Sequence, residues 1–319
     1  MTSTVVATAT DRRAARAAEG RLRRRSPRRR GRGGLIGLLF ALPFILVFIA
    51  FGVGPLLASA AMSFTDMTVS DIRNPLGVDV VGFDQFAQLF HDRLFWQSLG
   101  VTMTFVLLSV PLTLAAGLAL AVVLDRGIRR FRALFRVGFY TPVITSIVAV
   151  AVVWRYLLQP DGIVNSALET IGIVGPNWLN DTRTALPALV AMSVWRGMGN
   201  MMIIFLAGLQ AVPRETLEAA SVDGAGPWRS FWSVTLPQLR PTMLLATVIL
   251  TIGFLQIFEE PFVMTGGGPL ASTTSLSLFV YNQFGYGKYA YGTAAAYVLF
   301  VIIAALAVLQ FRVLRSKEN

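Results

Sequence analysis

Six long runs of apolar residues alternate with shorter polar segments along the chain. Each run supplies the roughly 20 residues that a helix needs to cross the hydrocarbon core of a membrane. Because lipid offers no hydrogen-bond partners to the backbone, such segments fold as helices. The predicted spans are residues 35–62, 98–124, 134–158, 186–211, 243–263 and 293–311. We therefore expect an all-α membrane protein with six transmembrane helices.

Prolines inside the spans and a short helix between two of them modify this pattern. Proline has no backbone N–H, and its ring clashes with the preceding helical turn, so it bends or breaks a helix. We expect kinks at the four prolines inside the predicted spans, Pro43, Pro55, Pro111 and Pro142. A short interfacial helix is also expected at about residues 84–89, between the first two spans.

The basic residues orient the predicted spans. If the N-terminus is cytoplasmic, the cytoplasmic segments hold 22 of the 28 Lys and Arg residues, and the outer segments hold 4. Positive charge accumulates on the cytoplasmic side of membrane proteins. The asymmetry predicts that both termini and residues 212–241 lie in the cytoplasm.

The N-terminal segment 1–34 holds eleven of the basic residues and precedes the transmembrane domain, residues 35–319. We expect a disordered cytoplasmic tail that touches anionic lipid. A nucleic-acid-binding arm fits less well, because the tail runs directly into an apolar span. Signal cleavage near Ala58-Ser59-Ala60 also fits less well, because the apolar run from Leu35 exceeds the length of a signal sequence.

Composition excludes several kinds of chemistry. The chain is 55% hydrophobic and 14% charged, and it has no Cys and a single His. Disulfides and thiolate chemistry are thereby excluded, and we interpret His91 as a solvated loop residue. No Gly-x-x-x-x-Gly-Lys-[Ser/Thr] phosphate loop is present, so we expect no enzyme activity and no ATP hydrolysis by the chain itself.

The polar segment 212–241, called here the 212–241 loop, has the pattern of a helix–turn–helix. A first helix is expected after Pro213, with acidic residues near its N-terminus. Two glycines then break it and allow positive φ, Pro227 starts a second helix, and Pro237 ends that helix. Trp228, Phe231 and Trp232 share one face of the second helix. An ordinary interfacial segment would have similar aromatic residues but would not need the fixed Gly and Pro positions.

The 212–241 loop resembles the "EAA" cytoplasmic loop of importer-type ABC permeases. The matching residues are Glu218, Ala219, Ala220, Asp223, Gly224, Ala225, Gly226, Leu236 and Pro237. Residues 195–197, 205–210 and 261–269 resemble the carbohydrate branch of the family, in particular the first permease of a sugar-uptake pair. The similarity covers about residues 35–315, with Glu259-Glu260 standing where an acidic–apolar pair is commoner.

The resemblance implies a type I importer permease in the bacterial plasma membrane. It implies a second related permease, two ABC ATPase subunits and an extracytoplasmic sugar-binding protein as partners. ATP and Mg²⁺ would be used by the ATPases, and this chain would hold no cofactor, no metal and no nucleic acid. The 212–241 loop would dock on an ATPase, and transport of a sugar, in particular an oligosaccharide, would proceed by alternating access.

Polar residues at membrane depth are candidates for a substrate path, because burying them in lipid is unfavourable. Aromatic rings would stack on the sugar and polar groups would bond its hydroxyls. The candidates are Tyr140, Trp154, Trp195, Arg196, Asn200, Gln256, Glu259 and Glu260. The alternative is an Arg–Glu pair buried between helices, with the tryptophans as interface anchors. The spacing does not decide between the two.

Two other transport functions remain as alternatives. A secondary transporter would need coupling-ion carboxylates near the membrane midplane, whereas the acidic residues here lie towards the outer ends of the spans. An ABC permease for another solute, such as a glycerol phosphate, would share the same loop. A membrane enzyme is disfavoured by the lack of a nucleophile–base–metal constellation.

Overall fold

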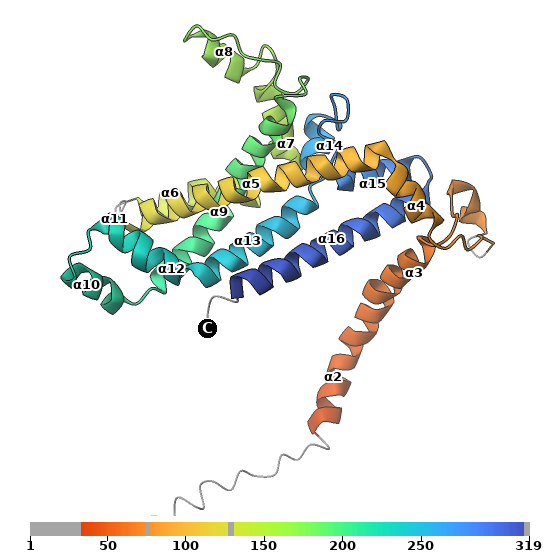
Figure 1. Cartoon of the computed structure of the whole chain (residues 1–319), viewed down its shortest axis with the longest axis horizontal. Coiled ribbons are helices and arrows are strands. Elements are labelled where there is room, and N and C mark those ends of the chain that lie inside the picture. Colours follow the sequence, from red (N-terminus) through yellow and green to blue (C-terminus); the bar gives the residue numbers. More distant parts are fainter. Residues whose placement is uncertain (1–32, 75–76, 127–130, 316–319) are drawn as a thin grey trace, which may run out of the picture. The chain divides into compact units, whose positions relative to one another are not determined.

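The computed structural model describes residues 33–74, 77–126 and 131–315. Nearly all of the predicted tail, residues 1–34, lies outside these ranges. The described residues are almost entirely helical, and their only strand-like pairing is an isolated bridge between Thr65 and Val80. The predicted all-α class is therefore confirmed (Figure 1).

The chain divides into two compact units, residues 1–58 and 59–319, which are described separately. Helix α2 (Gly33–Phe48) of the first unit continues through a π-helical turn, η1 (Ile49–Val53), into α3 (Gly54–Met62), whose last four residues belong to the second unit. The Gly54 N–H bonds the Ile49 carbonyl, five residues back. This wider turn comes directly before Pro55, which has no N–H of its own to donate, so the disturbance expected at Pro55 takes the form of a π turn.

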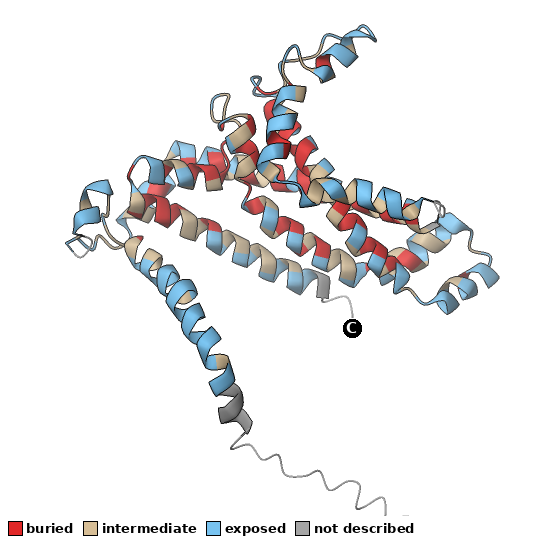
Figure 2. Ribbon diagram, turned by 180° about the vertical axis from the view of Figure 1, so that it is seen from behind, coloured by how far each residue is buried: buried red, intermediate tan, exposed pale blue. Residues whose placement is uncertain are grey.

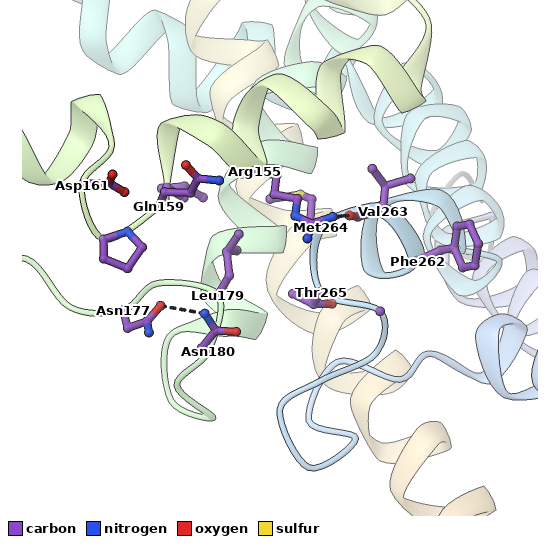
Figure 3. A pocket seen from close by; sticks show the side chains of 13 residues that line it. Arg155, Gln159, Asp161, Asn177, Leu179, Asn180, Phe262, Val263, Met264 and Thr265 are labelled. Atoms are coloured by element: carbon purple, nitrogen blue, oxygen red, sulfur yellow. Dashed lines mark hydrogen bonds between the residues drawn. The ribbon is translucent and has the colours of Figure 1, made fainter.

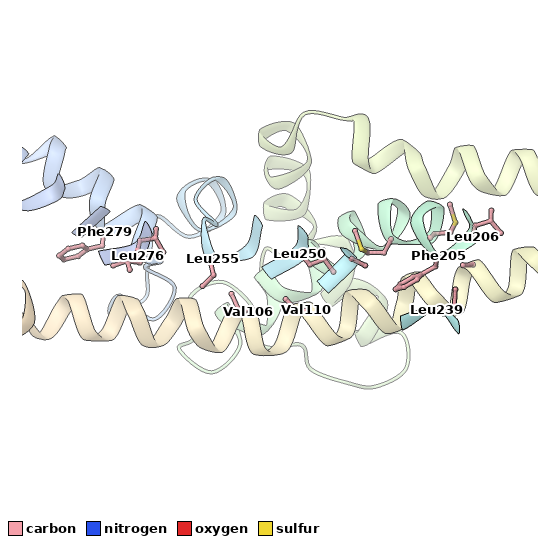
Figure 4. Close-up of a cluster of buried hydrophobic side chains, with 14 of the residues drawn as sticks. Val106, Val110, Phe205, Leu206, Leu239, Leu250, Leu255, Leu276 and Phe279 are labelled. Carbon is pink, nitrogen blue, oxygen red and sulfur yellow. The ribbon is translucent and has the colours of Figure 1, made fainter. Parts of the chain in front are cut away.

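The core of the second unit lies between long helices. Helix α5 (Arg93–Arg126) packs along α9 (Ala185–Gln210), and α13 (Arg240–Leu255) and α16 (Tyr289–Arg315) run beside them (Figure 1). Side chains such as Val106, Phe205 and Leu255 form one buried apolar cluster (Figure 4), and Figure 2 shows the buried residues concentrated on these helices. Pro111 lies within α5 without interrupting it.

Shorter helices occupy the segments between the long ones. They are η2 (Val69–Arg73), α4 (Asp84–His91), α8 (Ile163–Glu169), α10 (Arg214–Val222) and α15 (Leu276–Gly285). Helix α4 confirms the short helix predicted at about residues 84–89. His91 is exposed, as expected, but it is the last residue of α4 and does not lie in a loop.

Two of the predicted spans are not continuous helices. The third is broken into α6 (Arg132–Ile144) and α7 (Ile147–Leu157), bent by 97° at residues 145–146, three residues after Pro142. The fifth ends at Leu255, and α14 (Glu259–Met264) follows separately. Within α14, Pro261 falls in the first turn, where a helix needs no N–H donors. Four described helices are long and apolar enough to cross a membrane unbroken. Up to six spans result if two bent pairs each count as one span: α6 with α7, and residues 227–238 with α13, which are bent by 66°.

Close helix packing depends on Gly199 in α9. A Cβ at Gly199 would lie 2.0 Å from the backbone carbonyl oxygen of Phe139 in α6, which cannot rotate away. We therefore expect Gly199→Ala to destabilise the protein by about 1–3 kcal/mol through overpacking. Thermal unfolding in detergent measures this, with Gly100→Ala as control, because a Cβ at Gly100 meets nothing within 4 Å. An unchanged melting temperature for Gly199→Ala would contradict the packing of α6 on α9.

Candidate functional site

The 212–241 loop forms two helical arms joined by a turn. The first arm is α10, which follows Pro213, and the second begins with α11 (Pro227–Ser230). The second arm continues through a π-helical turn, η3 (Phe231–Thr235), into α12 (Leu236–Gln238). The helix–turn–helix predicted from the sequence is therefore present (Figure 1).

Gly224 forms the turn between the arms. Its φ is +76°, a left-handed conformation that glycine adopts without strain. The Gly224 N–H donates to the Ser221 carbonyl at 3.1 Å, and the Ala225 N–H donates to the Ala220 carbonyl at 2.9 Å. These bonds satisfy carbonyl groups at the end of α10. The sequence also predicts positive φ for Gly226, and this prediction is wrong. Gly226 has an extended backbone, with φ of −63° and ψ of 167°, and it is the residue before the first turn of α11.

The second arm also differs from the prediction at Pro237, which does not end the helix. The Leu236 N–H bonds the Phe231 carbonyl, five residues back, so the helix widens just before the proline. Helix α12 then continues to Gln238. The wider turn accommodates a residue that has no N–H and a bulky ring, as it does before Pro55.

The 212–241 loop has an inner face and an exposed face. Ala220, Thr235 and Leu239 are buried. Trp228 and Trp232 are 76% and 52% exposed, and their ring centroids lie 5.8 Å apart. Exposed aromatic pairs on a rigid support are typical of protein interfaces.

The predicted path residues do not converge on one cavity. Trp154 and Trp195 have ring centroids 5.7 Å apart and share a mostly apolar hollow of about 430 Å³ beside α7 and α9. The other six candidates do not line it: Tyr140, Arg196, Asn200, Gln256, Glu259 and Glu260. Tyr140 and Asn200 are half-buried in α6 and α9. Gln256 follows the end of α13, and its exposed side chain donates to the Ile252 carbonyl of that helix.

Glu260 and Arg196 form a second, separate group. Glu260 is only 5% exposed and accepts one long hydrogen bond, 3.4 Å, from the Ser193 hydroxyl. The charges of Arg196 and Glu259 lie close enough to act on Glu260. The Nε atom of Arg196 is buried and has no hydrogen-bond partner among the described residues. The structure therefore brings Arg196 and Glu260 near each other, and their role as a buried pair or as part of a substrate path stays a prediction.

A polar cavity of about 480 Å³ lies at another place, beside the ends of α7 and α14 (Figure 3). Its polar lining includes Arg155, Gln159, Asp161, Asn177 and Asn180. Arg155 stands out in the sequence as a charge near the end of the predicted third span, but the other four are ordinary polar residues of a predicted loop. Only the fold brings the segments together.

Comparisons with known proteins agree with the membrane fold. Residues 110–317 match the family "Binding-protein-dependent transport system inner membrane component". The chain is 37% identical over 284 residues to the probable ABC transporter permease protein YesP of Bacillus subtilis (strain 168), covering 87% of this chain and 90% of the relative. It is 34% identical over 288 residues to the lactose transport system permease protein LacF of Rhizobium radiobacter, and the match covers 88% of this chain and 95% of that relative.

Solved structures give the same result. A bacterial ABC transporter that imports the acidic polysaccharide alginate contains a chain with a TM-score of 0.77 and 26% identity, covering 88% of this chain and 96% of that one. A second structure shows an alginate transporter in complex with a periplasmic protein that holds an alginate pentasaccharide. Its matching chain has a TM-score of 0.74 and 26% identity, and the match covers 86% of this chain and 93% of that one. With the family match spanning most of the transmembrane region, the chain belongs to the inner-membrane permease components of binding-protein-dependent ABC transporters.

Proposed function

We propose that the chain is the permease subunit of an ATP-driven sugar importer, with an oligosaccharide as the substrate. The observation that carries this proposal is the 34% identity to a lactose permease subunit over 88% of the chain. The likeness to an alginate importer supports a carbohydrate substrate in the same way. Membership in the permease family favours this function over a secondary transporter.

The partners follow from the proposed function. A second related permease would complete the path, and an extracytoplasmic binding protein would deliver the sugar, as the periplasmic protein bound to the alginate transporter suggests. Two ABC ATPases would hydrolyse ATP with Mg²⁺, since this chain contains no phosphate loop. The exposed Trp228 and Trp232 of the 212–241 loop would insert into an ATPase, which would drive alternating access through α10 and α13.

Uptake by a deletion strain tests the proposal. Cells that lack this chain should lose uptake of one or more radiolabelled neutral oligosaccharides, such as lactose, raffinose or maltotriose, and a plasmid copy should restore it. Uptake of glycerol 3-phosphate should not change. If the deletion abolishes glycerol 3-phosphate uptake and leaves every sugar unaffected, the sugar assignment is wrong and the alternative solute is supported.

Docking on an ATPase requires the 212–241 loop to be cytoplasmic. The native chain has no Cys, so single Cys probes report their own location. Val222 and Val174 are matched sites, 88% and 90% exposed, on predicted inner and outer segments. In intact cells we expect an impermeant maleimide to label Val174→Cys and not Val222→Cys. Val222→Cys should react only after the membranes are solubilised. Labelling of Val222→Cys from outside would reverse the predicted topology.

A further inference from the structure

The polar cavity beside α7 and α14 has the size of a small-molecule site. Its volume of about 480 Å³ falls within the roughly 300–1,000 Å³ of ligand pockets. Three segments line it: the end of α7 with the following turn, residues 177–180 before α9, and residues 262–266 (Figure 3). Most of this lining belongs to the segments predicted to face outward.

The cavity offers mixed hydrogen-bonding groups and no net charge. Arg155 and Asp161 contribute one charge of each sign, and Gln159, Asn177 and Asn180 contribute three amides. A guanidinium only donates, a carboxylate only accepts, and an amide does both. A sugar hydroxyl also donates and accepts, so this set suits several hydroxyls at once. The opposite charges cancel, so the cavity has no overall preference for an ion.

Much of this bonding capacity is unused within the chain. The Gln159 amide and the Asp161 carboxylate make no hydrogen bond with any described residue. Arg155 uses one nitrogen to donate to the Val263 carbonyl at 3.3 Å, and Asn180 donates to the Asn177 side chain at 3.0 Å. The remaining donors and acceptors are available to a ligand.

Apolar residues also line the cavity. Leu158, Leu179 and Met264 are 6%, 7% and 2% exposed, and Phe262 lies on the side away from the polar lining residues (Figure 3). The ring of Phe262 is fixed by stacking on Phe258, with centroids 5.2 Å apart. Small-molecule sites commonly combine an apolar base with a few placed polar groups.

Asn165 holds the walls of the cavity in place. This buried residue donates to the carbonyls of Pro160 and Pro176 at 3.0 and 3.2 Å, and it accepts from the Trp178 indole at 2.7 Å. It therefore joins the two ends of the outer loop directly beside Asp161 and Asn177. A wall fixed before binding loses little conformational entropy when a ligand arrives.

We propose that this cavity is a subsite for one neutral pyranose unit of an oligosaccharide, separate from the membrane residues predicted from the sequence. The proposal rests on the proposed function as a sugar importer. The subsite holds the sugar at the outer mouth by hydroxyl contacts to Asp161, Gln159 and Asn180. An acidic sugar is not favoured there, because Asp161 cancels the attraction that Arg155 would give to a carboxylate.

Protection of an introduced thiol tests the subsite. Pro160 lines the cavity, and its side chain is apolar, so Pro160→Cys places a probe there without removing a polar group. The assembled transporter is labelled with maleimide alone and with maltotriose, raffinose or cellotriose, without binding protein. A sugar at about ten times its Kd should slow labelling about tenfold. Labelling of Val174→Cys, on the same loop but outside the cavity, should not change.

The charge of Asp161 sets the choice between neutral and acidic sugars. Trigalacturonate should not protect Pro160→Cys. In the Pro160→Cys protein, a further Asp161→Asn substitution should weaken the protection of the thiol by neutral sugars. Trigalacturonate should then protect the thiol. Glu169→Gln is the matched control, since Glu169 is an exposed acid on the same loop outside the cavity.

The outcomes separate the subsite from the general function. Failure of all three neutral sugars to protect Pro160→Cys, in a transporter whose deletion abolishes sugar uptake, overturns the subsite and leaves the function standing. Protection by the binding protein alone would make the cavity a protein-docking pocket, which also overturns the proposal. Protection by trigalacturonate equal to that by maltotriose overturns the preference for a neutral sugar.

Discussion

Replacing Gly224 with valine is expected to uncouple transport from ATP hydrolysis while leaving the membrane domain folded. Gly224 has a φ of +76°, and a β-branched residue in the left-handed region is strained by about 1–3 kcal/mol. The loop would relieve this strain by changing the angle between α10 and α11. If docking loses that much free energy, ATPase binding weakens by about 5- to 150-fold. Co-purification of the ATPase and ATP-driven uptake measure the loss.

Two control variants separate backbone strain from a clash with the partner. A Cβ at Gly224 or at Gly226 meets nothing within 4 Å in this chain. Gly226→Ala should be tolerated, because its φ of −63° suits any residue. Gly224→Asn should retain most activity if backbone strain is the cause, since asparagine adopts the left-handed region more readily than valine. Loss of activity in both Gly224 variants would indicate that the ATPase packs against the glycine. If Gly224→Val binds the ATPase and takes up sugar normally, the conformation of this turn is not needed for docking.

The helical class and the turn at Gly224 could be predicted because both follow from local sequence. Apolar runs of sufficient length must become helices in lipid. Positive φ at Gly224 follows from a glycine placed after a short helix. Gly226 shows the limit of this argument, because a glycine before Pro227 can serve equally as an extended helix start.

The breaks in the third and fifth spans could be predicted only in part. Pro142 indicated a disturbance, but whether a proline bends a helix or ends it depends on tertiary packing. The bend of 97° between α6 and α7 is therefore not encoded in one residue. Hydropathy also joined α13 to α14, because the Ile257 and Phe258 that separate them are apolar although they lie outside any helix.

The polar cavity beside α7 and α14 could not be predicted as a site. Asp161 and Asn177 lie 16 residues apart in the sequence, and Met264 comes much later. They line one cavity because α14 packs on α7 and because Asn165 joins Pro160 to Pro176. Contacts of this kind have no periodicity, so a search for intramembrane charge finds Arg155, Arg196 and Glu260 but not the loop residues that complete the cavity.

Replacing Arg196 with alanine is expected to lower the stability of the protein more than it lowers the activity of the molecules that fold. Glu260 is 5% exposed, and the hydrogen bond that it accepts from the Ser193 hydroxyl is long, 3.4 Å. Arg196 supplies the positive charge near this carboxylate. Removing one member of a buried charge pair costs about 3–5 kcal/mol, and we expect the lower end, because no direct hydrogen bond joins the two side chains. Melting temperature in detergent and the yield of folded protein measure this loss.

A second substitution decides between a buried charge group and a substrate path. Glu260→Gln removes the stranded charge, so Arg196→Ala/Glu260→Gln should recover most of the stability lost in Arg196→Ala. Arg312→Ala controls for the loss of a surface arginine and should change stability by less than about 0.5 kcal/mol. If the two residues instead bind the sugar, Arg196→Ala would melt normally, and the double variant would take up no more sugar than either single variant. If Arg196→Ala melts at a lower temperature and the double variant recovers it, Arg196 and Glu260 stabilise the packing of α9 against α14. Sugar recognition then belongs to other surfaces of the chain.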